Sequence, residues 1–341
     1  MIHIRGLTKR YGGTLAVDDL SFDVPPGVVT GFLGPNGAGK STTMRAIVGL
    51  DRPTSGSVTV NGHRYQELRA PLREVGSLLE ARSVHPGRSA YNHLLFLARS
   101  NGLPKRRVEE VLELVGLRAV ARKRAGGFSL GMGQRLGIAA ALLGDPSTMI
   151  FDEPVNGLDP EGIIWVRNLM RSLAAEGRAV LVSSHLMAEM ALTADRLVVI
   201  GKGRLIADTT VREVTEGAGG GRVLVRGADQ LRLRSALEAA GGSVTDGAEG
   251  ALLVEGLVAP RIGEVAHLAD VVLHELTPQV ASLEEAFMEL TAGAVEFRAG
   301  AGRPASGAPG ATTATGATAP TGATAPVRAV AGTGATSGTE R

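Results

Sequence analysis

The stretch GPNGAGKST, residues 34–42, decides the fold of this chain. It fits the pattern G-x-x-x-x-G-K-[ST], in which glycines let the backbone curl so that its N–H groups face phosphate oxygens. The apolar run VVTGFL, residues 28–33, predicts a buried strand before it, and residues 42–50 predict a helix after it. This order of strand, loop and helix indicates a nucleoside triphosphate site.

Each residue of the loop suits one contact with a nucleotide. Lys40 is predicted to reach the β- and γ-phosphates, and the Ser41 hydroxyl to bind Mg²⁺. The rest of the loop is predicted to surround the phosphates: Gly34, Pro35, Asn36, Gly37, Ala38, Gly39 and Thr42. The alternative is a chance match in a chain with 47 glycines, which the flanking strand and helix disfavour.

The bulk composition limits the class of protein. A chain of 341 residues that is 44% hydrophobic can bury a sizeable core and form two domains. No apolar run reaches the roughly 20 residues that cross a bilayer, and the first residues lack the apolar segment of a secretory signal. Cysteine is absent, which suits a reducing compartment. We therefore expect a cytoplasmic protein.

Charge gives no indication of a nucleic-acid partner. The formal net charge is +2, aromatic residues make up 3%, and Lys and Arg are scattered along the chain. A nucleic-acid-binding protein normally gathers basic residues into a stripe or patch. We expect no nucleic acid among the partners.

Residues 1–215 alternate strand-like and amphipathic segments, which predicts an α/β domain on a mostly parallel sheet. Between about residues 85 and 143 the pattern is helical instead. The apolar residues that share a helical face are Tyr91, Leu94, Leu95 and Ala98, and then Val108, Val111, Leu112 and Val115. We expect a helical subdomain inserted into the α/β core.

Residues 222–297 predict a small accessory α/β domain of ferredoxin-like character. Its strand-like runs RVLVR, ALLVEG and VVLHEL are separated by helical segments at 231–240 and 260–269. A last helix begins at Ser282, with Glu285 completing a capping box. Residues 298–341 contain the near repeat ATGATAPTGATAP and are too poor in large apolar side chains to fold, so we expect a disordered tail.

A second acidic motif narrows the chemistry. In TMIFDEP, residues 148–154, a strand-like run ends in two carboxylates. Asp152 suits Mg²⁺, and Glu153 is placed to polarise an attacking water, which indicates hydrolysis rather than transfer to a second substrate. The alternative is a strand that ends in an acidic turn, and the preceding phosphate loop favours the site.

With FSLGMGQRLGIAAAL, residues 128–142, the chain resembles the ATP-binding subunits of ABC transporters, from Met1 to about Arg212. In that family a segment like LSGGQQR opens a helix whose N-terminus faces the γ-phosphate bound by the opposite subunit. The matching residues are Ser129, Gly131, Gln134 and Arg135, whereas Leu130 and Met132 replace the usual Gly and Gln. Read alone, Ser129 is an ordinary helix cap.

The resemblance implies roles for three further residues. Asp159 in NGLDP corresponds to the loop that crosses the dimer interface, and His185 in VLVSSHL to the switch histidine at the γ-phosphate. Tyr11 in KRYGG corresponds to the aromatic residue that stacks on adenine. Taken alone, His185 is a structural strand-end histidine and Tyr11 an exposed tyrosine.

Glu80 in GSLLEARSVHPG replaces the family's Gln, which touches Mg²⁺ and water. Glutamate can still bind the metal, but it adds a negative charge beside the γ-phosphate. Subunits that resemble the bacitracin- and daunorubicin-resistance exporters look similar at this position.

The resemblance implies an ATP- and Mg²⁺-dependent ATPase subunit on the inner face of the cell membrane. Its implied partners are a second ATPase domain and a separate integral membrane permease, and its implied task is export of a drug, antibiotic or lipid-like cargo. Two alternatives stay open: a soluble ABC-type ATPase of ribosomes or DNA, and the ATPase of a regulated importer. A single phosphate loop and the lack of sustained heptads disfavour the first.

Overall fold

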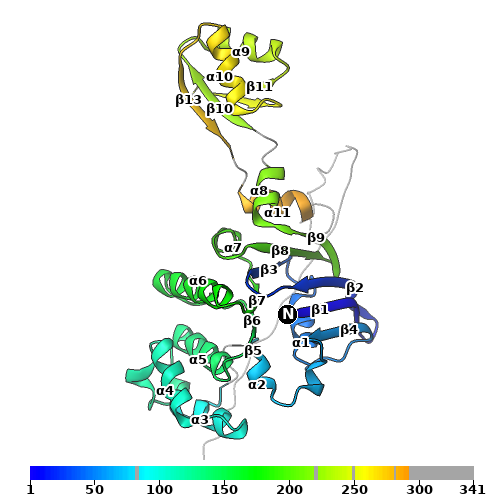
Figure 1. Cartoon of the computed structure of the whole chain (residues 1–341), viewed down its shortest axis with the longest axis vertical. Coiled ribbons are helices and arrows are strands. Elements are labelled where there is room, and N and C mark those ends of the chain that lie inside the picture. The colour runs from blue at the N-terminus through cyan, green and yellow to red at the C-terminus, as the bar shows by residue number, and fades with distance from the viewer. Residues whose placement is uncertain (81–83, 219–221, 248–249, 280–281, 292–341) are drawn as a thin grey trace, which may run out of the picture. The chain divides into compact units, whose positions relative to one another are not determined.

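The computed structural model describes residues 1–80, 84–218, 222–247, 250–279 and 282–291 (Figure 1). The expected tail, residues 298–341, lies outside the described residues.

A six-stranded sheet forms the centre of the ATPase region, in the order β5-β6-β7-β3-β8-β9. Its strands are β3 (Val29–Leu33), β5 (Val75–Leu78), β6 (Thr148–Asp152), β7 (Ala179–Ser183), β8 (Arg196–Gly201) and β9 (Arg204–Thr210). All neighbours are parallel except β9, which pairs antiparallel with β8. Strands covered on both faces read as continuous apolar runs, and β3 is accordingly buried at every residue. The predicted mostly parallel sheet is confirmed.

A second, antiparallel sheet has the order β2-β1-β4 and covers the other side of the phosphate-loop helix. It consists of β1 (Ile2–Tyr11), β2 (Thr14–Val24) and β4 (Ser55–Val60), and the helix is α1 (Lys40–Ile47). Ile2 and Ile4 alternate inward along β1, and Phe22 of β2 packs on Phe32 of β3 with ring centroids 5.2 Å apart. The two sheets therefore hold α1 in a shared apolar core.

The predicted helical subdomain is confirmed as α3 (Ala90–Ser100), α4 (Lys105–Leu114) and α5 (Leu130–Leu142). Of the residues predicted to share faces, Leu94, Ala98, Val108, Val111 and Val115 are fully buried. Short elements connect this region: η1 (Tyr65–Glu67), α2 (Pro71–Glu74), η2 (Arg118–Val120) and η3 (Ala125–Gly127).

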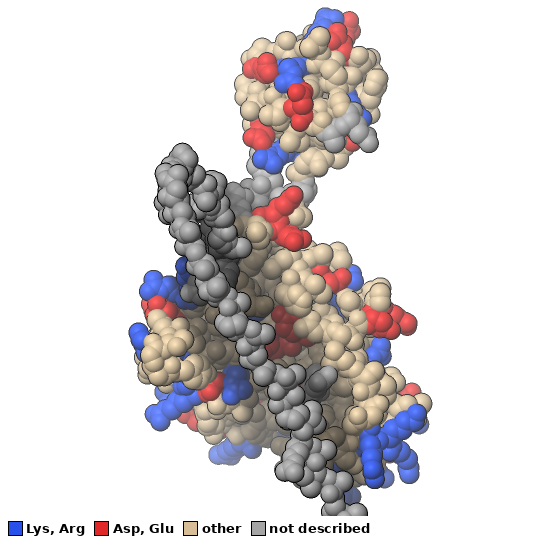
Figure 2. All heavy atoms as spheres, turned by 180° about the vertical axis from the view of Figure 1, so that it is seen from behind, with Lys and Arg blue, Asp and Glu red and all other residues tan. Residues whose placement is uncertain are grey.

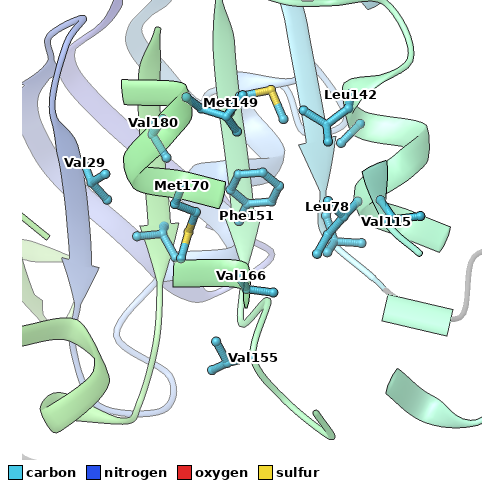
Figure 3. Packing of buried hydrophobic residues seen from close by; sticks show 14 of the residues in the cluster. Val29, Leu78, Val115, Leu142, Met149, Phe151, Val155, Val166, Met170 and Val180 are labelled. Carbon is cyan, nitrogen blue, oxygen red and sulfur yellow. The ribbon is translucent and has the colours of Figure 1, made fainter. Parts of the chain in front are cut away.

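One apolar core joins the sheet to the helical subdomain and to the long helix α6 (Pro160–Ala175). Figure 3 shows Phe151 of β6 beside Met170 of α6, and Leu78 of β5 pointing toward Val115. The edge strand β5 therefore makes the contact between the sheet and the helical subdomain.

After β7 the chain forms α7 (Met187–Thr193), and after β9 it forms α8 (Val211–Ala218).

The accessory unit has a sheet of four antiparallel strands in the order β11-β12-β10-β13. Its elements are β10 (Val223–Gly227), α9 (Gln230–Ala239), β11 (Ser243–Asp246), β12 (Leu252–Glu255), α10 (Ala259–Leu268) and β13 (Leu273–Pro278). This βαββαβ order is the ferredoxin-like arrangement that the sequence predicted. The unit has its own apolar core, which includes Val225, Leu233 and Ile262, and basic and acidic side chains are interspersed over the face of it that Figure 2 shows.

The last helix, α11 (Leu283–Thr291), corrects the expected domain range of 222–297. Its capping box is present, since Ser282 and Glu285 each donate a backbone N–H to the other's side chain. However, the helix packs against α7, α8 and β9, and its buried residues belong to the core of the ATPase region. By its packing α11 is part of the ATPase region, because its apolar face completes that core.

We predict that Gly76→Ala lowers the free energy of unfolding by about 1–3 kcal/mol, the usual cost of overpacking. A Cβ on Gly76 would overlap the Ala141 carbonyl oxygen of α5, and a helix backbone cannot yield as a side chain can. Gly13→Ala is the control, because a Cβ there meets no atom within 4 Å. Urea unfolding measures both, and equal stability of the two variants would contradict this contact.

Candidate functional site

The carboxyl ends of four parallel strands lie at one edge of the central sheet. Ser183, at the end of β7, pairs with Asp152 of β6 and with Phe32 of β3. Leu78 of β5 pairs with Phe151 of β6. The segments that follow these strands therefore start side by side, at the edge where open α/β sheets bind ligands.

The phosphate loop follows β3 and leads into α1. A pocket of about 260 Å³ is lined by residues 36–42, Ala16, Asp152 and Glu153. Gly37 and Gly39 have φ values of 82° and 103°, and a Cβ on Gly39 would lie 2.6 Å from the Ala16 carbonyl oxygen. Only glycine fits there, so the loop can turn its N–H groups and the N-terminus of α1 toward an anion.

Lys40 supplies a buried positive charge to this pocket. Its side chain is only 8% exposed, and its Nζ donates to the carbonyl oxygens of Gly34 at 2.6 Å and Pro35 at 3.3 Å. Burial lowers the pKa of Lys40, and the Glu153 and Asp152 carboxylates act in the opposite direction. A phosphate group is a stronger partner for this ammonium than carbonyl oxygens are.

Ser183 and Gln134 hold the acidic pair from two sides. The buried Ser183 hydroxyl donates to Asp152 Oδ1 and accepts the Glu153 backbone N–H at 3.0 Å. Gln134 of α5, also buried, donates to the Glu153 carbonyl oxygen at 3.2 Å. Glu153 has φ 50°, a conformation that non-glycine residues seldom adopt without such support.

The contacts of Ser183 and Gln134 with the acidic pair were not predicted from the sequence, in which Gln134 was identified only as part of the signature. The signal for Ser183 was a polar residue at the end of an otherwise apolar strand, VLVS.

His185 contacts the second residue of the acidic pair. Its Nδ1 lies 2.7 Å from Glu153 Oε2, and its backbone N–H donates to the same oxygen at 3.4 Å. The His185 side chain is 53% exposed and that of Glu153 24%, so both can meet a bound substrate. The structure thus brings together two residues that are 32 positions apart in the sequence.

The oxygen donors near the phosphate loop fit a magnesium ion. Ser41 and Asp152 line the same pocket, and Mg²⁺ is commonly held by one or two carboxylates with substrate phosphates and waters. Within the described ranges, no group of three or more His, Cys, Asp or Glu side chains forms a metal site of its own. The donor set therefore fits a metal that arrives with phosphates.

Tyr11 is fixed by contacts that also reach α1. Its hydroxyl donates to Asp51 Oδ2 at 2.8 Å, and the same carboxylate pairs with Arg45 of α1 at 2.7 Å. Burial and the Asp51 carboxylate raise the pKa of Tyr11. The ring stays 46% exposed, with Lys9 Nζ 4.8 Å from its centroid, so it offers a face for stacking.

Ser129, Gly131 and Asp159 lie together, but not among the residues that line the phosphate-loop pocket. They line a separate pocket of about 300 Å³. Ser129 caps α5 by accepting the Met132 N–H at 3.2 Å, and Asp159 caps α6 by accepting the Gly162 N–H at 2.9 Å. Ser129 is therefore an N-cap of α5 in this structure, as the alternative interpretation of this residue predicts.

The departures from the signature have a packing consequence. A Cβ on Gly157 would overlap the Leu130 side chain, so Leu130 covers this glycine.

Glu80 is exposed and follows β5 at the same edge of the sheet as the acidic pair.

A parallel sheet with a phosphate loop and a strand-end acidic pair defines the class of P-loop nucleoside triphosphatases. Residues 17–156 match the family described as ABC transporter. An uncharacterized ABC transporter ATP-binding protein of Bacillus subtilis, YhcH, is 37% identical over 306 residues, which cover 85% of this chain and 96% of that protein. This chain belongs to the ATP-binding proteins of ABC transporters.

Other relatives match mainly the ATPase region. The bacitracin transport ATP-binding protein BcrA of Bacillus licheniformis is 43% identical, over 61% of this chain and 69% of that protein. The lantibiotic transport ATP-binding protein SrtF of Streptococcus pyogenes is 37% identical, over 61% of this chain and 90% of that protein.

A solved ATP-binding subunit of an ABC transporter has a TM-score of 0.59 at 29% identity, covering 64% of this chain and 93% of its own. CbiO1 of Clostridium perfringens, part of the CbiONQ complex, has a TM-score of 0.55 at 27% identity, covering 62% of this chain and 89% of its own. Residues 221–284 match a domain of unknown function, DUF8746.

The chain is therefore an ATP-binding and ATP-hydrolysing subunit of an ABC transporter, as the sequence predicted. Subunits of this family dimerise and work with membrane permease subunits. Among the described residues, no helix combines the length and apolar character needed to span a bilayer. The comparisons give no support to a ribosome- or DNA-acting ATPase.

We predict that Lys40→Ala raises the Kd for ATP about 10- to 100-fold, the cost of losing hydrogen bonds to a charged group. Calorimetric titration measures this directly. Lys105→Ala is the matched control, because Lys105 is exposed at the start of α4. An unchanged Kd in Lys40→Ala would contradict the assignment of the phosphate loop.

Proposed function

We propose that this subunit powers export of an antibiotic-like or lipid-like cargo through a separate permease, with the phosphate-loop pocket as one half of each hydrolytic site. The observation that carries the hydrolytic part of the proposal is the contact between Glu153 and His185, with Glu153 lining the same pocket as the buried Lys40. A carboxylate, an imidazole and an ammonium at one sheet edge suit hydrolysis of a bound triphosphate.

The roles follow from the chemistry of each group. Lys40 binds the β- and γ-phosphates, and Ser41 and Asp152 hold Mg²⁺, which neutralises phosphate charge when bound. Glu153 polarises the attacking water, and His185 orients that carboxylate and meets the γ-phosphate. Tyr11 stacks on the adenine ring.

The second half of each site is proposed to come from another ATPase domain. Ser129 and the first N–H groups of α5 form an anion site, yet they lie outside the pocket that contains Lys40. Asp159 lines the pocket of Ser129. Two domains arranged head to tail would place each Ser129 at the other's γ-phosphate, in a homodimer or a heterodimer.

The permease is proposed to dock near Glu80 and the helical subdomain, within residues 85–117. A pocket of about 340 Å³ borders this region at Val84 and Pro86, and its other lining residues, which include Phe128 and Ser129, lie between positions 125 and 136. Leu94 of this segment is fully buried and is not available for docking. Phe96 is 52% exposed, with the Arg88 guanidinium 4.5 Å from its ring centroid, and is the proposed apolar contact.

The cargo class rests on relatives whose names refer to bacitracin and lantibiotic transport. Docking on a permease places the subunit on the inner face of the cell membrane. Co-purification with the permease, followed by ATPase assays with bacitracin and with a lantibiotic, tests this proposal. Stimulation only by a solute taken up through a binding protein would favour the importer alternative instead.

Glu153→Gln is expected to keep ATP binding and to lower kcat about 10²- to 10⁴-fold, the usual loss when a general base is removed. Steady-state phosphate release and calorimetry give the two values. Glu264→Gln is the control, since it makes the same change at an exposed glutamate of α10. Turnover within a few-fold of wild type would exclude Glu153 as the catalytic carboxylate.

A further inference from the structure

Helix α7 begins two residues after His185 and is tied closely to it. The Leu186 N–H donates to Ser184 Oγ, and the Met190 N–H donates to the Leu186 carbonyl, both at 3.0 Å. These hydrogen bonds restrict movement of the backbone between the imidazole and the helix. A shift of α7 therefore moves His185 relative to Glu153.

α7 depends on its neighbours for its position, because a helix of seven residues is not stable alone. Met190 packs on β3 so closely that a Cβ on Gly31 would lie 2.5 Å from its Sδ. Glu189 pairs with Arg167 of α6 at 3.3 Å. These contacts fix two sides of the helix.

α11 provides the third side. Leu283, Ala286 and Phe287 are 3%, 0% and 8% exposed, and their spacing places them on one face of the helix. They share a buried cluster with Met190 of α7 and Val214 of α8. Phe287 is the largest of these three side chains, so it contributes the most apolar surface of α11 to this cluster.

We propose that Phe287 is a positioning residue for ATP hydrolysis, which holds His185 against Glu153 by packing α11 on α7. This inference rests on the proposed role of His185 in hydrolysis. Phe287 is not among the residues that line the phosphate-loop pocket, so its proposed effect on hydrolysis passes through α7.

In the sequence, the accessory unit lies between two helices of this cluster. Its strands β10 to β13 come between α8, which ends at Ala218, and α11, which begins at Leu283. Both α8 and α11 contribute residues to the buried cluster that contains Met190 of α7.

The test is a double-mutant cycle in the full chain, with kcat, KM for ATP and thermal stability measured for each variant. Phe287→Ala is expected to lower kcat about tenfold, since small displacements of catalytic groups cost this much or more. KM should stay within about twofold because the phosphate loop is unchanged. In the His185→Ala background the same change should alter kcat less than about twofold, because coupled residues are not additive.

Met288→Ala is the matched control, because Met288 is 62% exposed on the same helix. If Phe287→Ala does not fold, Phe287→Leu, which keeps an apolar side chain, should show a smaller loss with the same dependence on His185. Equal losses in both backgrounds, or an unchanged kcat in the folded variants, would overturn the inference while leaving the proposed function intact. Full activity of His185→Ala would instead remove the proposed role of His185 and this inference with it.

Discussion

The parallel pairing of β3, β6 and β7 underlies both the central sheet and the site at its edge. It makes three separate stretches of sequence end at one sheet edge, with Ser183 in register with both Asp152 and Phe32. The phosphate loop, the acidic pair and His185 follow from those ends. A shift of one residue in β6 would turn Asp152 to the other face of the sheet and remove the site.

Glu153 connects this edge to the helical subdomain. Its unfavourable backbone conformation is supported on one side by Ser183 of the sheet and on the other by Gln134 of α5. The same helix begins at Ser129, which faces a different pocket. One helix therefore links the carboxylate proposed to be catalytic in one subunit to the surface proposed to meet the nucleotide of its partner.

Much of the fold could be predicted from the sequence because its strongest signals are local. The apolar run before the phosphate loop forms β3, and the predicted helical faces that contain Leu94 and Val111 are buried in the core. Strand β11 was missed because its residues Ser243–Asp246 are mostly polar and mostly exposed, so they lack the apolar alternation of a strand.

The parts of the site that could not be predicted depend on tertiary contacts. The motifs identified Glu153 and His185 separately, but only strand pairing shows that they touch. Ser183 supports both carboxyl residues from a neighbouring strand. In the same way, nothing local to Phe287 distinguishes packing on α7 from packing on the accessory sheet, and only the fold decides between them.

The central claim is that this chain holds only one half of each hydrolytic site. Light scattering of the Glu153→Gln protein with and without ATP tests it most directly, because slow hydrolysis preserves the assembled state. For a homodimer, saturating ATP should double the mass, ADP should not, and adding Lys40→Ala should abolish the effect. A wild-type chain that stays strictly monomeric in ATP while hydrolysing it at full rate would mean that one chain forms a complete site.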